Sequence, residues 1–214
     1  MSSDSIPKTL DGIRDLYEGN LAAHGTTSKS VGWRDEASQQ LRFERLARVI
    51  DRDAGAFTVN DWGCGYGAMF GYLDGVFGTA MTRYTGYDIS QEMLAAAKTK
   101  CADARAVFVN GGDVTTEADY TFVSGTFNVK LEASDEEWDA YIKRHLEAMY
   151  AKSSRGIAFN LLTSHVDWKQ DNLFYADPGN FVDFCKRQLS RYVTLVHDYQ
   201  LFEWTMLVTR DARP

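Results

Sequence analysis

The chain has 214 residues, of which 44% are hydrophobic and 25% charged, with a formal net charge of −7 at pH 7. This composition is typical of an ordinary folded protein of about one globular domain, and it excludes a disordered chain. The acidic balance argues against a general affinity for nucleic-acid phosphates or anionic membranes, because both need a basic face.

Three widely spaced cysteines, Cys64, Cys101 and Cys185, form neither a disulfide framework nor a CxxC metal pair. The first eight residues do not have the pattern of a secretory signal. No apolar run approaches the roughly 20 residues that span a bilayer. We therefore expect reduced thiols and a cytoplasmic protein that is neither exported nor inserted into a membrane.

The N-terminal residues 1–34 are expected to form a lid or cap over a core at 35–214, and the two together make a single domain. Apolar side chains at near-helical spacing from Ile13 to Leu21 predict a short helix there. An amphipathic helix is expected over residues 35–52, leading into the main sheet.

Short β-rich runs then alternate with helical stretches, which is typical of a doubly wound parallel sheet. The seven predicted strands are Phe57–Asp61, Tyr84–Asp88, Ala106–Val109, Tyr120–Ser124, Gly156–Leu162, Tyr192–Tyr199 and Phe202–Thr209. The predicted helices between them are Ala68–Gly75, Gln91–Cys101, Asp135–Ala151 and Asn180–Ser190. Because almost nothing joins the last two runs, they predict an antiparallel hairpin. The predicted fold class is α/β, doubly wound, with a mostly parallel seven-stranded sheet that ends in this hairpin.

After the first predicted strand, glycines occupy three alternate positions, Gly63, Gly65 and Gly67. Glycine permits positive φ and lets the backbone come close to a ligand. Asp61, at the strand end, can accept hydrogen bonds from loop amides or, through water, from a cationic ligand group. The glycine pattern alone also fits a nicotinamide cofactor, because residues 63–68 satisfy G-x-G-x-x-A.

Acidic residues also follow the next two predicted strands. Asp88 can hold both hydroxyls of a ribose, with Ile89 beside it to pack on an adenine, and Asp113 can accept a hydrogen bond from the adenine amino group. Because adjacent strands of a doubly wound sheet end in one crevice, we expect Asp61, Asp88 and Asp113 to share one ligand site.

These segments resemble the motifs of the class I S-adenosylmethionine (SAM) dependent methyltransferases. The matching motifs are Asp61-x-Gly63-x-Gly65-x-Gly67, Gly86-x-Asp88-Ile89-Ser90 followed by Met93, and Gly112-Asp113-Val114. The resemblance implies a Rossmann-like methyltransferase fold, SAM as the methyl donor and S-adenosylhomocysteine (SAH) as the product.

In the small-molecule branch of that family, an arginine on the helix before the glycine loop binds the SAM carboxylate. Arg42 is suitably placed for this role, and Arg45 and Arg48 compete for it. The full set of predicted cofactor-binding residues is Arg42, Asp61, Gly63, Gly65, Asp88, Ile89, Met93, Asp113, Val114, Ser124 and Gly125.

The acceptor side of the site is expected at the ends of the fourth and fifth strands and in the cap. His165 is the first candidate for a general base, because an imidazole pKa near 6.5 suits proton removal, and His24 is the second. No His, Cys, Asp or Glu cluster has metal-ligand spacing, so we expect a metal-free enzyme. The predicted substrate-pocket residues are Trp33, Asn128, Asn160 and Tyr175.

The sequence thus favours a SAM-dependent methyltransferase that acts on a small molecule such as a sugar, a natural product or another metabolite. No Pro-Pro pair occurs, unlike in the nucleic-acid enzymes that methylate amino groups. Two alternatives stay open. One is a nicotinamide-dependent oxidoreductase, although the chain has no Tyr-x-x-x-Lys pair, and the other is a protein that binds SAM without catalysis. The oligomeric state does not follow from the sequence.

Overall fold

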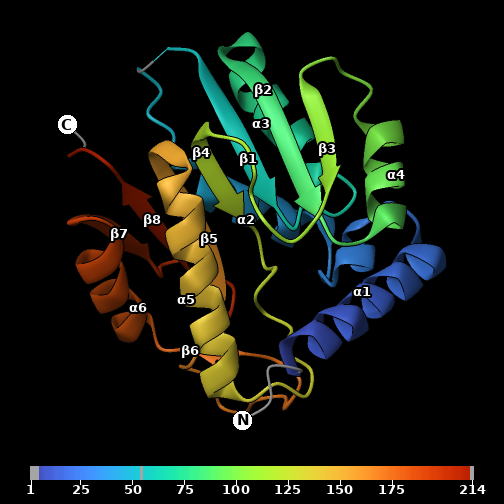
Figure 1. Ribbon diagram of the computed structural model, residues 1–214, viewed down its shortest axis with the longest axis vertical. Coiled ribbons are helices and arrows are strands. Elements are labelled where there is room, and N and C mark those ends of the chain that lie inside the picture. The colour runs from blue at the N-terminus through green and yellow to red at the C-terminus, as the bar shows by residue number, and fades with distance from the viewer. Residues whose placement is uncertain (1–4, 54, 213–214) are drawn as a thin grey trace.

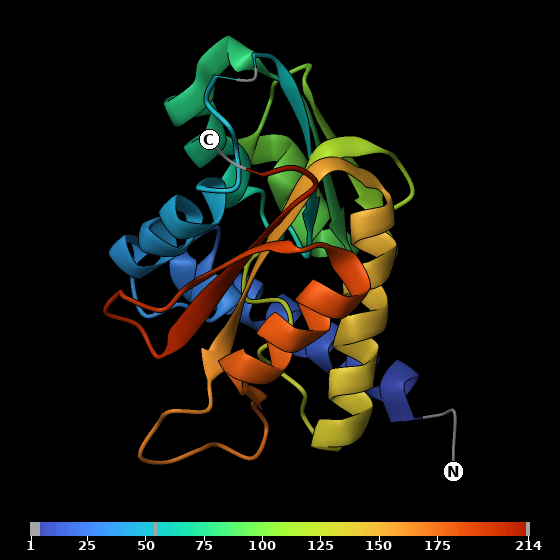
Figure 2. The same cartoon turned by 90° about the vertical axis from the view of Figure 1, so that its left-hand side faces the viewer.

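The β-rich runs of the chain form one sheet with helices on both faces (Figures 1 and 2). The computed structural model describes residues 5–53 and 55–212. The strand order is β3-β2-β1-β4-β5-β8-β7, and β6 pairs with β5 off this path. The strands are β1 Phe57–Trp62, β2 Met81–Asp88, β3 Ala106–Asn110, β4 Ala118–Val123, β5 Ser153–Thr163, β6 Tyr175–Ala176, β7 Tyr192–Val196 and β8 Glu203–Thr209.

The predicted fold class is confirmed, because the strands pair in parallel except for β8, which is antiparallel to β5 and β7. Two details differ from the prediction. The two-residue strand β6 was not foreseen. The connection within the hairpin is also longer than expected, since β7 ends at Val196 and β8 begins at Glu203. Tyr199 explains this difference, because its hydroxyl shares a hydrogen bond of 2.8 Å with Thr205 and folds the connection back against β8.

The helices begin where side chains cap the first turn. Asp35 accepts from the Ser38 amide at the start of α2, Ser90 caps α4, and the predicted capping box of Ser134 opens α5. The N-terminal helix has 20 residues and is therefore not short. The last predicted helix ends early, at Phe184, where a wider π-type turn follows. The helices are α1 Ser5–His24, α2 Glu36–Ala47, α3 Ala68–Phe77, α4 Gln91–Lys100, α5 Asp135–Ala151 and α6 Pro178–Phe184.

Each face of the sheet has its own apolar core. On one face, α5 and α6 bury Trp138, Leu146 and Phe181 against the strands. On the other face, α2 and α3 bury Leu46 and Leu73. Figure 1 shows α5 in front of the sheet and α3 behind it. Because both sheet faces are covered, the central strands β1 and β4 are buried at almost every position, including the polar residues Asn60 and Thr121.

The strand order reverses at β1, whose neighbours are β2 and β4. In doubly wound sheets, ligands bind in the crevice at the carboxyl ends of the strands, next to such a reversal. Helix α1 lies across these strand ends (Figure 1) and contributes residues to the pocket there. No helix in residues 5–53 and 55–212 is long and apolar enough to cross a membrane.

Candidate functional site

The glycine loop connects β1 to α3 at the point where the strand order reverses. Gly63, Gly65 and Gly67 have φ of +73°, +51° and +78°, in the backbone region that favours glycine. A Cβ at Gly63 would lie 2.2 Å from the Oγ1 of Thr126, so packing also excludes a side chain there. The Gly63 amide donates to the Tyr87 carbonyl at 2.8 Å, which ties the loop to β2. The loop therefore presents its backbone to the crevice.

Asp88 ends β2 and lines the crevice beside this loop. Its Oδ2 accepts from the Gly65 amide at 2.8 Å, and its Oδ1 accepts from the Ser90 amide at 2.9 Å. Burial raises the pKa of Asp88, while the Ser90 and Gly65 amides favour the carboxylate and oppose that rise. Tyr17 of α1 lies near this carboxylate, and burial, helped by the charge of Asp88, raises the pKa of Tyr17 to about 12. A carboxylate held in this way can accept hydrogen bonds from ligand hydroxyls.

A pocket opens between the glycine loop, the strand ends and α1. Its empty volume, counted out to the open mouth, is about 790 Å³, and small-molecule sites have volumes of roughly 300–1,000 Å³. The structure brings together on its wall a large part of the predicted site. These residues are Trp33, Gly63, Gly65, Asp88, Ile89, Met93, Ser124 and Gly125.

Further lining residues were missed in the sequence analysis. Helix α1 contributes one face, since spacings of three and four place Leu10, Ile13, Arg14 and Tyr17 side by side. The apolar spacing of this helix was the available signal for those residues. Val31, Ser90, Gly111, Gly112 and Thr126 were also missed. Four more missed residues are aromatic, and their positions fit ordinary core packing, so the sequence offered no comparable signal. They are Trp62, Tyr87, Trp138 and Tyr141.

Asp61 lies beneath the glycine loop and is not part of the pocket wall. Its side chain is buried and accepts a hydrogen bond from the Tyr84 hydroxyl of β2. Burial raises the pKa of Asp61 to about 7, although the Tyr84 hydrogen bond opposes the rise. In this structure Asp61 therefore joins β1 to β2, and its contact with a cationic ligand group stays a prediction.

Asp113 and Val114 lie beside the pocket. The Asp113 side chain is 86% exposed, and its Oδ1 is 3.8 Å from the Nε2 of His145. The preceding residue, Gly112, lines the pocket, and its carbonyl accepts from the Trp62 indole at 2.9 Å. Val114 packs partly buried against the core. The predicted contact between Asp113 and adenine therefore stays a prediction.

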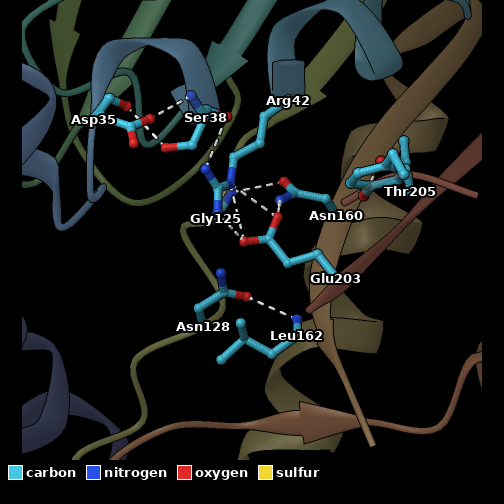
Figure 3. Close-up of polar contacts among 10 residues, drawn as sticks. Asp35, Ser38, Arg42, Gly125, Asn128, Asn160, Leu162, Glu203 and Thr205 are labelled. Carbon is cyan, nitrogen blue, oxygen red and sulfur yellow. Dashed lines mark hydrogen bonds and ion pairs between the residues drawn. The ribbon is translucent and has the colours of Figure 1, made fainter. Parts of the chain in front are cut away.

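Arg42 does not line the pocket and is held in a buried ion pair, so its predicted contact with the SAM carboxylate stays a prediction. Its Nε lies 2.9 Å from both carboxylate oxygens of Glu203, and a second nitrogen donates to the Ser38 carbonyl at 2.9 Å (Figure 3). The side chains of Arg42 and Glu203 are only 8% and 1% exposed. The Trp33 ring stacks on the Arg42 guanidinium at 3.6 Å from its centroid. Of the competing arginines, Arg45 pairs with Glu44.

Asn160 of β5 connects this ion pair to the pocket wall (Figure 3). Its Nδ2 donates to Glu203, and its Oδ1 accepts from the Gly125 amide at 2.8 Å. Asn160 does not itself line the pocket. Its side chain is fully buried, so it supports the wall from behind.

Asn128 and Ser124 carry polar atoms that are buried without a hydrogen-bond partner among the described residues. The Ser124 hydroxyl does so on the pocket wall. The Oδ1 of Asn128 accepts from the Leu162 amide at 3.2 Å, which leaves its Nδ2 as the unpaired atom. Buried polar atoms are almost always paired in folded proteins, so an unpaired one in a pocket wall indicates a place for a ligand atom.

The two candidate bases do not line the pocket. His165 is exposed in the connection after β5, with its Nδ1 3.2 Å from the Thr163 hydroxyl. His24 is exposed at the end of α1. Tyr175 likewise lies outside the pocket, where its hydroxyl accepts from the Gln170 amide at 3.3 Å. The described residues contain no group of three or more His, Cys, Asp or Glu side chains placed to hold a metal ion.

Comparison with known proteins agrees with this geometry. A family model described as "Methyltransferase domain" matches residues 59–153, from within β1 to the start of β5. A protein of Mycobacterium tuberculosis named "Putative methyltransferase Rv1506c" is 46% identical over 168 residues, which cover 77% of this chain and 99% of that protein.

Solved structures show the same fold at low sequence identity. One is the magnesium protoporphyrin IX methyltransferase of Synechocystis with bound SAM, which has a TM-score of 0.63 and 14% identity over 98% of this chain and 99% of its own. Another is the pyocyanin biosynthetic protein PhzM, with a TM-score of 0.59 and 14% identity over 97% of this chain and 70% of its own. Because the mycobacterial relative is 46% identical over 77% of this chain, the chain belongs to the class I SAM-dependent methyltransferases.

Proposed function

We propose that the protein transfers the methyl group of SAM to a small, largely apolar acceptor that enters the pocket under α1. The observation that carries this proposal is the pocket itself. It places apolar and aromatic side chains of α1 and α5, among them Ile13, Tyr17 and Trp138, opposite the glycine loop. Such a wall excludes water and favours an apolar or ring-shaped molecule.

The residues on the pocket wall fit SAM. Asp88 offers a carboxylate to the ribose hydroxyls, Ile89 and Met93 offer apolar surface to the adenine, and the unpaired Ser124 hydroxyl can bond the polar methionine end. When bound, SAM supplies a methyl group on a sulfonium, which is a good leaving group. The task of this chain is therefore to orient the acceptor in line and keep water out.

The division into a cap at residues 1–34 and a core at 35–214, within one methyltransferase domain, belongs to the same proposal. Lining residues from α1, together with Val31 and Trp33, support it, because they close the pocket over the strand ends. The net charge of −7 is consistent with a small-molecule acceptor and disfavours nucleic acid. The names of two structural neighbours also refer to small molecules, protoporphyrin and pyocyanin.

Calorimetry with SAM, SAH and NAD, followed by SAH release across a library of metabolites, tests the proposal. We expect SAM and SAH to bind and an apolar acceptor to give turnover that EDTA leaves unchanged. Binding of NAD alone would favour the oxidoreductase. Silence with every acceptor class despite SAM binding would favour a SAM-binding protein without catalysis.

A further inference from the structure

The first residue of β8, Glu203, carries a carboxylate far from solvent. Its side chain is 1% exposed, and burial of a charge is costly unless it is paired and hydrogen-bonded. Arg42 provides the countercharge, with its Nε 2.9 Å from both oxygens. A buried ion pair contributes little net stability compared with apolar side chains of the same size. Stability alone therefore does not account for this arrangement.

The hydrogen-bond chemistry of Glu203 dictates the orientation of Asn160. A carboxylate only accepts hydrogen bonds, so Asn160 must turn its Nδ2 toward Glu203. Its Oδ1 then points the other way and accepts from the Gly125 amide at 2.8 Å. Gly125 lines the pocket, so the carboxylate of β8 orients a pocket wall that it does not touch.

A second connection runs through the ion pair to Trp33. The indole stacks on the Arg42 guanidinium at 3.6 Å from the ring centroid. Its edge also fills the space beside Gly125, where a Cβ would lie 2.2 Å from the Cη2 of Trp33. Trp33 and Gly125 are thus neighbouring parts of the pocket wall. Both are held by partners of Glu203, namely Arg42 and Asn160, which Figure 3 shows.

We infer that Glu203 is a positioning residue for the cofactor pocket, acting through Asn160 on Gly125 and through Arg42 on Trp33. The inference rests on the proposed use of this pocket for SAM. It assigns Arg42 to the pocket's support, in place of the expected direct contact with the SAM carboxylate. It also gives the antiparallel strand β8 a part in cofactor binding.

Two variants of the full-length protein test this inference through the dissociation constant of SAH, measured by calorimetry. In Glu203→Gln, the new amide oxygen is drawn to Arg42, so its NH₂ faces the NH₂ of Asn160, and we expect SAH to bind about tenfold more weakly. In the double variant Arg42→Met with Glu203→Gln, the amide oxygen is free to accept from Asn160. The introduced methionine also keeps an apolar contact with the Trp33 ring, so we expect the SAH affinity of this variant to return to within about threefold of the wild type.

The control is Thr121→Val, which removes a buried hydrogen bond of 2.7 Å to Ser153 elsewhere in the sheet. We expect it to lower the melting temperature without changing SAH affinity. If Glu203→Gln loses only thermal stability, like this control, the inference is wrong. If the double variant binds SAH more weakly than Glu203→Gln, Arg42 contacts the cofactor directly and the inference is again wrong.

The neutral double variant leaves no unpaired buried charge, so it decides the question even if Glu203→Gln does not fold. In that case a tenfold loss of SAH affinity in the double variant overturns the inference. If the wild-type protein binds SAH but methylates no acceptor, the proposed function is wrong. The comparison of SAH affinities between the variants and the wild type still tests the inference in that case, because it does not depend on turnover.

Discussion

The substitution Asp88→Ala tests the proposed cofactor site most directly. It removes the acceptor of the Gly65 amide, at 2.8 Å, and the carboxylate that we assign to the ribose hydroxyls. A hydrogen bond to a charged group is worth about 1.5–3 kcal/mol. The net loss of one such bond corresponds to SAH binding that is about 10 to 150 times weaker. Asp88 is partly buried and is oriented by the Gly65 and Ser90 amides, so we expect the effect to lie inside that range.

The assay is calorimetry with SAH at one fixed salt concentration, with Asp113→Ala as the matched control. The Asp113 side chain is 86% exposed, so its hydrogen bonds compete with water, and we expect less than about a threefold change. Equal losses at Asp88 and Asp113 would refute the argument from burial. An unchanged affinity in Asp88→Ala would refute the proposed ribose contact.

Three further predictions follow from the geometry. The pKa of Asp61 is about 7 in the folded protein, against 3.8 for the free group, so its contribution to stability is complete below pH 4 and is lost as the pH rises through 7. In urea unfolding, the stability of Asp61→Asn relative to the wild type should therefore be greater at pH 8 than at pH 5. An equal difference at both pH values would contradict the raised pKa. Gly63→Ala should abolish measurable SAH binding, because the added Cβ would overlap the Thr126 side chain. The control is Gly71→Ala, where the helix face is exposed and the space is open. It should raise the melting temperature, because alanine adds about 0.5–1 kcal/mol of stability in a helix. His165→Gln and His24→Gln should each keep turnover within about threefold, because neither side chain lines the pocket, and a loss of about 100-fold in either would identify that residue as the base.

The sequence predicted the alternation of strands and helices well because local rules decide it. Glycine spacing, the Ser134 capping box and the apolar runs are all readable from neighbouring residues, and the structure places them as expected. The positions of Asp88, Gly63 and Gly65 on the pocket wall follow from the same rules, since parallel strands end at one edge. The predicted ends of some elements were wrong, as at the hairpin, whose connection is longer than expected. Such errors arise where a tertiary contact, here the hydrogen bond between Tyr199 and Thr205, competes with local preference.

Only the tertiary structure decided which partner each charged side chain has in distant parts of the chain. Arg42 and Glu203 are 161 residues apart, and no local pattern indicates that they pair instead of binding a ligand. The burial of Asp61 and the exposure of Asp113 were likewise not predictable, because Asp61 lies within β1 and packs against β2, whereas Asp113 lies in the loop after β3. The sequence by itself thus determined the family, the sheet and the glycine loop. The packing of β8 and α1 against that sheet determined which polar groups support the pocket and which side chains form its wall, because those contacts join segments that are distant in the chain.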